Sequence, residues 1–408
     1  MSTRTWLLLL GAGHAHLPLI HAIPRLRRHG VSVTVVDPND RLWYTGMMSA
    51  VLGGAVAPFA AEIPVRSMVE SGAGIFLLDS VTRIDPDRRL VFTASGAEPA
   101  WDVASVAVGS TVVPPFPVAD GDTPRLFPVK PIGRLPEIVE FAQGALDRSG
   151  FGRTFRVVCV GGGPSAVEIA GNLIRRLRIS RGVVPGDGAL SVTVVTRGSR
   201  LLTAFPAVAG DIVRESLVRR RVKVVADEEE REVSAEGVVT DRMVYPADAV
   251  IVATGLNPPT LNQSLTQNGD SRPTADLWRD DDGSLQVDDT LRTSQGTLFG
   301  GGDCISIRGF DLPRNGVHAV RESRILVHNV QHLLGAGSDT ATPHLLRYSP
   351  PRAPLLIINP GDGTGIAVKG SIVRHGRSWL ALKRRIDWAF VRSRGRSIVP
   401  SVVGPPRP

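Results

Sequence analysis

The chain has 408 residues, of which 42% are hydrophobic and 21% are charged, and its formal net charge is +8. Such a composition is typical of a globular protein with enough material for two or three domains. It has no apolar run that approaches a membrane span, and the run from Leu7 to Leu10 is too short for the apolar region of a signal peptide. We therefore expect a cytoplasmic protein.

The positive charge suits a polyanionic partner, but no basic patch interleaved with aromatic residues indicates nucleic-acid binding. We expect a nucleotide or a membrane surface instead. The two cysteines, Cys159 and Cys304, have no CxxC or comparable spacing, so the sequence predicts neither a disulfide framework nor a metal site. Cys159 lies in a predicted buried strand, and we interpret it as a small core residue.

Residues 6–17 predict a short buried strand, a glycine turn and the start of a helix. Gly11 permits the tight turn, and Gly13 lets backbone N–H groups approach a pyrophosphate at the helix N-terminus. A second predicted strand, residues 31–37, ends in Asp37, where the ribose of a dinucleotide needs an acceptor. The third position of this fingerprint holds His16 instead of glycine.

Residues 155–168 repeat the pattern of apolar strand, glycine turn and helix start, with Gly161, Gly163 and Ala166 at the three fingerprint positions. Alanine at the third position still allows close packing of helix and strand. Two such turns predict two bound nucleotides, or an internal duplication that kept one ligand. The alternative for each is a tight turn that binds nothing.

Between and beyond these turns, the pattern predicts an α/β fold. The helix after the first turn carries Pro18 and Pro24 and ends near Gly30. Residues 75–110 are β-rich, residues 114–117 form a linker, residues 222–241 resemble a hairpin and residues 263–283 form an exposed loop. The segments 105–111 and 249–255 share an apolar strand that ends in a small residue and glycine, so each dinucleotide unit closes in the same way.

Residues 296–304 predict a strand and a glycine cluster, and a helical run to Leu333 follows. We expect this segment to return to the first dinucleotide unit. The predicted fold therefore has two Rossmann-like dinucleotide-binding domains, the second inserted in the first, plus a small C-terminal domain. The expected boundaries are 1–117 with 281–340, 118–280, and 341–408.

Taken in order, these motifs resemble the two-dinucleotide-binding-domain flavoproteins of the pyridine nucleotide-disulfide oxidoreductase superfamily. More closely, four short segments resemble the type II NADH dehydrogenase-like group, in particular the flavoprotein module fused to selenide, water dikinase. The segments are Gly13-His-Ala-His16-Leu, Tyr44-Thr-Gly-Met-Met48, Pro128-Val-Lys130-Pro and Gly316-Val-His-Ala-Val-Arg321. The resemblance spans residues 5–395 and implies FAD on the first domain, NAD(P)H on the second and hydride transfer to the flavin.

The resemblance also implies roles for individual residues near FAD. Asp303 would bind the ribityl chain or a phosphate, Tyr44 to Met48 would line the isoalloxazine, and the helix from Asn315 or Gly316 would face the flavin O2 edge. Lys130 would neighbour the flavin ring, unless it is a solvated lysine between two prolines. The implied cofactor-binding residues are Gly11, Gly13, His14, Asp37, Tyr44, Gly46, Met47, Gly109, Gly161, Gly163, Thr196, Arg197, Gly255, Gly302, Asp303 and Gly316.

Glu168 matches a helix position near the nicotinamide, or it is a first-turn glutamate that favours the helix dipole. The predicted catalytic residues are Glu168, Lys130 and His318. Where an NAD-preferring enzyme has an acid, this chain has Thr196 and Arg197, with Arg200 just beyond. This slightly favours NADPH over NADH, and it would also be expected of a vestigial nicotinamide site.

The motifs do not name the acceptor of the flavin's electrons. Disulfide reductases of this architecture carry a redox cysteine pair near residues 41–49, and this chain has none there. Any flavin must therefore pass its electrons to a small oxidant or a quinone. Quinone reductases of the group typically carry glutamines in the run that corresponds to residues 315–322, and this chain does not. His14, His16 and His318 are candidates for proton transfer, with packing or capping as the alternative.

Residues 379–394 predict a basic amphipathic helix with Trp379, Leu382, Ile386 and Phe390 on one face. That face is expected to meet an anionic membrane surface, to form a homodimer interface or to pack on the protein itself. The predicted function is an FAD-dependent NAD(P)H:acceptor oxidoreductase with quinone as the leading acceptor. The alternatives are a flavoprotein that acts on another small substrate and a low-turnover flavin-binding regulatory module.

Overall fold

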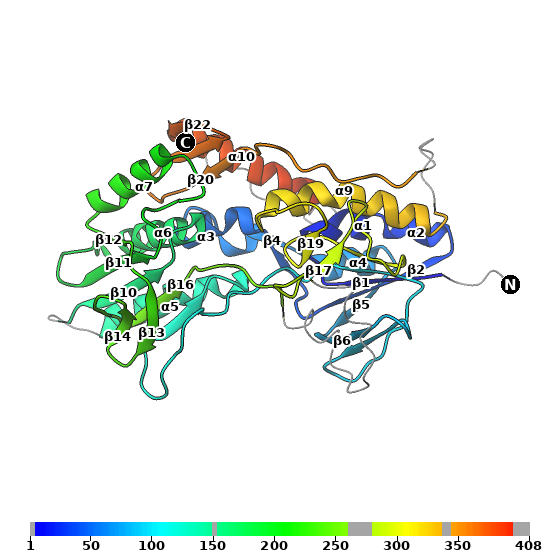
Figure 1. Cartoon of the computed structure of the whole chain (residues 1–408), viewed down its shortest axis with the longest axis horizontal. Coiled ribbons are helices and arrows are strands. Elements are labelled where there is room, and N and C mark those ends of the chain that lie inside the picture. The colour runs from blue at the N-terminus through cyan, green and yellow to red at the C-terminus, as the bar shows by residue number, and fades with distance from the viewer. Residues whose placement is uncertain (1–4, 149–152, 260–279, 337–343, 395–408) are drawn as a thin grey trace.

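A computed structural model describes residues 5–148, 153–259, 280–336 and 344–394. Figure 1 shows two lobes side by side, each built on a sheet, with the C-terminal segment lying across one side of both. Most of the predicted loop at 263–283 and the expected domain boundary at residue 340 lie outside the described residues.

The first sheet contains five parallel strands in the order β18-β8-β1-β2-β5. The strand β1 is central, and its residues Leu7 to Leu10 are buried, as expected of a parallel strand covered on both faces. The strands are β1 (Thr5–Leu10), β2 (Val31–Asp37), β5 (Ile75–Leu78), β8 (Val103–Val106) and β18 (Leu298–Gly300).

The second sheet is also parallel, in the order β12-β11-β10-β16-β9, and all its strands lie between β8 and β18 along the chain. The predicted fold class, with one Rossmann-like unit inserted in the other, is therefore confirmed. The strands are β9 (Arg125–Pro128), β10 (Phe155–Val160), β11 (Leu190–Thr196), β12 (Lys223–Ala226) and β16 (Ala249–Val252).

The predicted hairpin at residues 222–241 is only partly correct. Its first strand, β12, joins the parallel sheet, because Val224 and Val225 pair with β11. The antiparallel pairing begins after it, in the three-stranded sheet β13 (Glu230–Ser234), β14 (Gly237–Thr240) and β15 (Val244–Pro246). The other short strands are β3 (Leu42–Trp43), β4 (Glu62–Ile63), β6 (Val81–Asp85), β7 (Leu90–Thr93), β17 (Leu285–Val287) and β19 (Ile305–Ile307).

The helix after the first glycine turn is broken into three pieces: η1 (His14–His16), α1 (Leu17–His21) and α2 (Ile23–Arg28). Pro24 lies in the first turn of α2, where its missing N–H costs nothing, and this explains the break at Ala22. The second turn leads into one long helix, α6 (Pro164–Arg181). The remaining helices of the two lobes are η2 (Thr45–Met47), α3 (Met48–Leu52), η3 (Pro58–Ala61), α4 (Val65–Ser71), η4 (Ile132–Arg134), α5 (Leu135–Arg148), α7 (Ala207–Arg219) and α9 (Gly316–Leu333).

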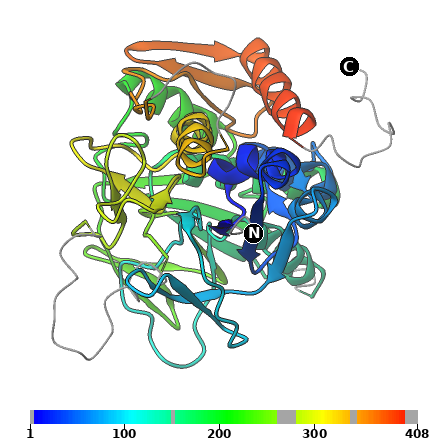
Figure 2. The same ribbon diagram turned by 90° about the vertical axis from the view of Figure 1, so that its right-hand side faces the viewer.

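The C-terminal segment forms the antiparallel sheet β20 (Leu356–Ile358), β21 (Gly365–Lys369) and β22 (Ile372–Gly376), followed by α10 (Arg377–Arg394). Ile358 and Ile366 belong to the core of the second lobe, while Phe390 of α10 packs against the core of the first. Figure 2 shows α10, in red, beside the blue helices of the first lobe. The C-terminal segment thus connects the two lobes.

Candidate active site

The first glycine turn packs against the chain that follows β8. Gly11 has a φ of +84°, and a Cβ atom there would lie 2.6 Å from the carbonyl oxygen of Ala107. A Cβ atom on Gly13 would lie 2.3 Å from the same oxygen. Both positions therefore require glycine for the turn to keep this geometry. Asp37, at the end of β2, accepts hydrogen bonds from the backbone N–H groups of Ala12 and Asn39 at 2.7 and 2.8 Å.

His16 replaces the third glycine and holds the turn from within. Its Nδ1 lies 2.6 Å from the carbonyl oxygen of Gly11, and its Nε2 lies 2.8 Å from Ser105 Oγ on β8. The side chain is fully buried, and burial lowers the pKa of His16 to about 4. With both ring nitrogens engaged, His16 fits the packing alternative and not proton transfer.

Lys130 and Asp303 form an ion pair between the two lobes. Lys130 follows β9 of the second sheet, Asp303 follows β18 of the first, and Ser110 follows β8. Ser110 Oγ donates to Asp303 Oδ2 at 2.9 Å and accepts from Lys130 Nζ at 2.8 Å. Although burial acts to raise it, the charge of Lys130 and these hydrogen bonds hold the pKa of Asp303 below its usual value. Lys130 is therefore not a simple solvated lysine.

His14 lies close to this pair and to Tyr44. The ring centroids of His14 and Tyr44 are 5.7 Å apart, and the charges of Asp303 and Lys130 both act on the imidazole. Burial lowers the pKa of His14 to about 4, so the ring is neutral at pH 7. Its Nε2 is buried and has no hydrogen-bond partner within the described residues. A buried polar atom without a partner is an expected feature of a site that binds a ligand.

The N-terminus of α9 lies near the same segment. Asn315 caps this helix, because its Oδ1 accepts from the N–H groups of Val317 and His318 at 3.1 and 3.4 Å. A Cβ atom on Gly316 would lie 3.7 Å from Thr45 Oγ1, which brings α9 to the Tyr44–Met47 segment. Met47 itself is buried in the core.

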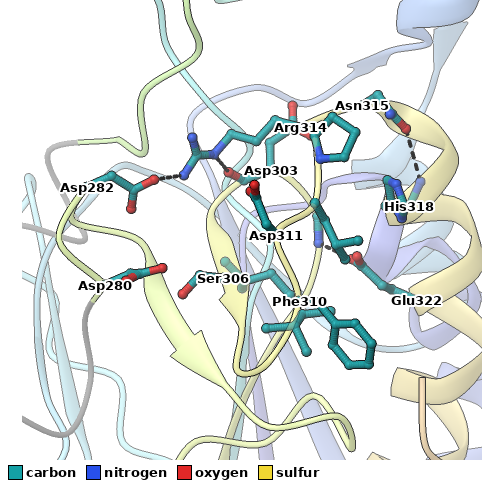
Figure 3. Close-up of a pocket in the computed structure, with 15 residues that line it drawn as sticks. Asp280, Asp282, Asp303, Ser306, Phe310, Asp311, Arg314, Asn315, His318 and Glu322 are labelled. Carbon is teal, nitrogen blue, oxygen red and sulfur yellow. Dashed lines mark hydrogen bonds and ion pairs between the residues drawn. The ribbon is translucent and has the colours of Figure 1, made fainter. Parts of the chain in front are cut away.

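Beside α9 lies a pocket of about 130 Å³ (Figure 3), bordered by Asp303, His318 and Glu322. Glu322 was not predicted as a site residue, although it follows His318 by one helical turn. It is 2% exposed, and its Oε2 accepts from the backbone N–H of Gly302 at 2.6 Å. His318 Nδ1 lies 2.8 Å from the hydroxyl of Tyr348. Burial raises the pKa of Glu322 to about 7 and lowers the pKa of His318.

The raised pKa of Glu322 predicts a pH-dependent stability. The folded state binds this proton more tightly than the unfolded state, so the protein loses stability as pH rises from about 4.5 to 7, by up to about 3 kcal/mol. Glu322→Gln keeps an acceptor for Gly302 but removes the charge. We expect the variant to be more stable than the wild type at pH 8 and equal to it near pH 4.5. Denaturant unfolding at both pH values tests this, and equal pH slopes for the two proteins would contradict it.

Arg314 joins the lobes at the same place and was also not predicted. Its guanidinium donates to the carbonyl oxygens of Asp303 and Leu256 at 3.0 and 3.1 Å, and to Ser284 Oγ at 2.6 Å. It also pairs with Asp282, as Figure 3 shows. One side chain therefore ties the end of the second sheet to the loop after β18.

The second glycine turn has the same backbone requirement as the first, with one difference. A Cβ atom on Gly161, whose φ is +124°, would lie 2.3 Å from the carbonyl oxygen of Ala253. By contrast, a Cβ atom on Gly163 would meet nothing within 4 Å, and Gly255 is equally open. Thr254 Oγ1 is buried without a partner in the described part of the chain. Open space beside a glycine turn is what the approach of a nucleotide requires.

Glu168, on α6, faces α3 and the C-terminal segment. Its Oε1 accepts from the backbone N–H of Asn359 at 2.7 Å and from Ser49 Oγ at 3.4 Å. Burial raises the pKa of Glu168, against the opposing charge of Lys383. It is thus more than a surface glutamate of the first helical turn.

The arginines expected near a 2′-phosphate differ in their surroundings. Arg197 is exposed, next to the buried Thr196 at the end of β11. Arg200 is engaged elsewhere, because its guanidinium donates to the carbonyl oxygens of Leu201, Leu202, Thr203 and Phe205. The expectation that Arg200 binds a phosphate is therefore not supported by its geometry.

The structure brings His14, Tyr44, Lys130 and Asp303 together, with Gly316 nearby. These residues come from both lobes and lie beside the first glycine turn. The protein therefore has two Rossmann-like lobes with a polar site at their junction. Within the described ranges, no group of three or more His, Cys, Asp or Glu side chains is placed to hold a metal ion.

The model of the pyridine nucleotide-disulphide oxidoreductase family matches residues 7–323, so the chain belongs to this family of flavoprotein oxidoreductases. The predicted superfamily is thereby confirmed. The finer resemblance to the module fused to selenide, water dikinase stays a prediction. A search of curated proteins found no match.

Several solved structures share the fold. Sulfide:quinone oxidoreductase from Aquifex aeolicus has a TM-score of 0.74 at 15% identity, over 97% of this chain and 93% of that one. NDH2 from Plasmodium falciparum in complex with NADH has a TM-score of 0.75 at 13% identity, over 98% and 100%. The water-forming NADH oxidase from Lactobacillus brevis has a TM-score of 0.66 at 20% identity, over 90% and 75%.

Proposed function

We propose that the protein is an FAD-dependent NAD(P)H:acceptor oxidoreductase with a quinone as its acceptor. The observation that carries the proposal is the junction site, where the unpartnered Nε2 of His14 lies near the Lys130–Asp303 pair and beside the first glycine turn. FAD is assigned to that turn and NAD(P)H to the turn at Gly161. The boundaries 1–117 with 281–340, 118–280 and 341–408 are part of the same proposal.

The residues present fit FAD. Gly11 and Gly13 keep the turn free of side chains where a pyrophosphate would lie, and the capped N-terminus of the 18-residue helix α9 favours negative charge. Lys130 supplies a positive charge beside Asp303. The chemistry that bound FAD supplies is the transfer of two electrons, so that NAD(P)H, one proton and a quinone become NAD(P)⁺ and the quinol.

A dithiol relay does not fit this chain. Its two cysteines lie in separate cores, Cys159 on β10 and Cys304 after β18. Burial raises the pKa of both thiols to about 12, which keeps them in the unreactive protonated form. This supports direct transfer to a small acceptor.

NADPH remains the proposed coenzyme, with Arg197 as the residue that binds the 2′-phosphate. Arg197→Ala should raise KM for NADPH by about tenfold, as expected for the loss of one charge-assisted contact, and leave KM for NADH unchanged. Steady-state kinetics with both coenzymes test this. Equal changes for both would remove Arg197 from coenzyme selection.

Turnover with a short-chain ubiquinone tests the proposed acceptor, with dioxygen and ferricyanide as comparison acceptors. We expect one quinol per NAD(P)H and the highest kcat/KM with the quinone. Rapid turnover with dioxygen or ferricyanide but not with the quinone would still support an oxidoreductase. It would contradict the proposal that a quinone is the acceptor. No turnover with any acceptor would favour a vestigial nicotinamide site or a regulatory module.

The second turn offers a separate test. In Gly163→Ala the new Cβ atom meets no protein atom, so the fold and the bound FAD should be unchanged. If a pyrophosphate approaches this backbone, KM for NAD(P)H should rise by about tenfold or more. An unchanged KM would mean that the nicotinamide coenzyme does not bind there.

Membrane contact is proposed through α10. Leu382 and Ile386 are 36% and 47% exposed, with Arg384 and Arg385 exposed beside them, whereas Phe390 packs inward on Tyr44. No helix in the described part of the chain is long and apolar enough to cross a membrane. We propose a cytoplasmic protein that binds the inner membrane face peripherally. Flotation with anionic but not neutral vesicles would support this, and a homodimer that does not float would contradict it.

A further inference from the structure

The C-terminal helix α10 places a buried ion pair against the segment proposed to line the flavin. Lys383 and Asp387 lie one helical turn apart, with Nζ and Oδ2 separated by 3.0 Å and side chains only 14% and 10% exposed. Lys383 lies in the helix predicted to be basic and amphipathic, but its side chain is largely buried and does not belong to the exposed basic face. Sequence spacing alone does not reveal burial, because the pair also reads as an ordinary i,i+4 surface contact.

The pair is bound to Tyr44 and Gly46, which lie far away in the sequence. The hydroxyl of Tyr44 donates to Asp387 Oδ1 at 3.1 Å, and Lys383 Nζ donates to the carbonyl oxygen of Gly46 at 2.6 Å. The ring of Phe390 stacks on Tyr44 with centroids 4.5 Å apart. A Cβ atom on Gly46 would lie 2.8 Å from Asp387 Oδ1, so the contact leaves no room for a side chain there.

A buried ion pair of this kind contributes little net stability, because both charges lose their hydration. The ion pair instead fixes a position, because its hydrogen bonds to Tyr44 and Gly46 hold this segment in place relative to α10. Tyr44 in turn lies 5.7 Å from His14, whose Nε2 has no partner in the described residues. The position of Tyr44 in the site is thus set from the C-terminal helix.

We propose that Asp387, held by Lys383, is a positioning residue that fixes Tyr44 in the site at which the acceptor is reduced. This inference rests on the proposed function. Asp387 acts through Tyr44, so the two residues should behave as one unit in any measurement of electron transfer to the acceptor.

The test compares Asp387→Ala, Tyr44→Phe and the double variant in anaerobic stopped-flow experiments. Reoxidation of the bound flavin by a short-chain ubiquinone is expected to be about tenfold slower in each single variant. Reduction of the flavin by NAD(P)H is expected to slow much less, because Asp387 acts on Glu168 only through its charge. The double variant should be no slower than Tyr44→Phe alone. Additive losses, or equal losses in both half-reactions, would overturn the proposal.

A matched control is Glu215→Ala, which removes an i,i+4 ion pair with Arg219 on the surface of α7, away from the site. It should leave both half-reactions at the wild-type rate. If Asp387→Ala fails to fold because Lys383 is left unpaired, the variant Lys383→Met with Asp387→Leu removes both charges and still deprives Tyr44 of its acceptor. It is expected to show the same slow reoxidation.

Hydrogen exchange gives a readout that does not depend on turnover. The N–H of Met47 donates to the carbonyl oxygen of Tyr44 at 3.0 Å, and the N–H of Tyr44 donates to that of Ala61 at 2.8 Å. Asp387→Ala should speed exchange of these amides by about tenfold or more. Unchanged exchange would overturn the proposal. If the wild-type flavin is not reduced by NAD(P)H at all, the proposed function fails, while this readout still tests the positioning role.

Discussion

Replacing Gly11 by alanine is expected to abolish stoichiometric FAD binding. The new Cβ atom would lie 2.6 Å from the backbone oxygen of Ala107, and this neighbour cannot rotate away as a side chain could. The backbone conformation, with φ at +84°, adds a cost of about 1–2 kcal/mol for any residue with a side chain. Together, the clash and the backbone cost should lower the affinity for FAD by well over tenfold, where tenfold is about 1.4 kcal/mol, so that the variant purifies without its flavin. Flavin absorbance of the purified variant and titration of the apoprotein with FAD measure this.

Gly96→Ala is the matched control for this prediction. Gly96 has a φ of +88°, close to that of Gly11, but a Cβ atom there meets nothing within 4 Å. The control therefore carries the same backbone strain without the clash. Full FAD content in Gly96→Ala and a folded but colourless Gly11→Ala are expected. A Gly11→Ala protein that keeps its FAD would show that the turn does not hold the cofactor.

Removing the charge of Lys130 is expected to have the second large effect. Lys130→Met leaves Asp303 partly buried and without its cation, which should lower the free energy of unfolding by about 2–3 kcal/mol. In the wild type, the lowered pKa of Asp303 adds stability at neutral pH that is lost as pH falls below about 4. In the variant, the hydrogen bond from Ser110 still opposes the effect of burial, but the charge of Lys130 no longer does. The pKa of Asp303 therefore rises, and the loss of stability should be larger at pH 8 than at pH 5.

The double variant Lys130→Met with Asp303→Asn completes the cycle. With both charges removed, no buried ion is left unpaired, so the double variant should be more stable than Lys130→Met alone. Urea unfolding of the four proteins measures the coupling. A double variant as unstable as the sum of the single variants would show that the two side chains act independently, in contradiction to the ion pair.

The fold was predictable because its signals are local. A few consecutive residues are enough to recognise each apolar strand, each glycine turn and the closing strands near Gly109 and Gly255. The return of the chain to the first sheet at β18 also followed from such a pattern. The predicted hairpin at 222–241 failed in part, because a four-residue apolar strand can join a parallel sheet or a hairpin with the same local pattern.

The site was only partly predictable, because its parts come from distant segments. The resemblance pointed to His14, Tyr44, Lys130 and Asp303, and the structure brings these residues together. It gave no indication of Asp387, whose partner Tyr44 lies more than 300 residues earlier. A polar residue on an amphipathic helix is usually exposed, and only the tertiary contact shows otherwise.

Glu322 and Arg314 were missed for the same reason. Glu322 lies in the predicted helical run that ends at Leu333, but its burial depends on the loop at Gly302 packing against α9. Arg314 precedes that helix, and its four acceptors come from three different segments of the chain. Such roles are set by packing between segments and carry no local sequence signal.

In the proposed reaction, NAD(P)H delivers its electrons to a flavin held by the first glycine turn. Anaerobic stopped-flow absorbance of the purified protein, mixed separately with NADPH and NADH, tests it most directly. The oxidised flavin absorbance is expected to disappear within seconds with at least one coenzyme, and faster with NADPH. Bound FAD that neither coenzyme reduces would contradict the proposed function and would mean that the second glycine turn is purely structural.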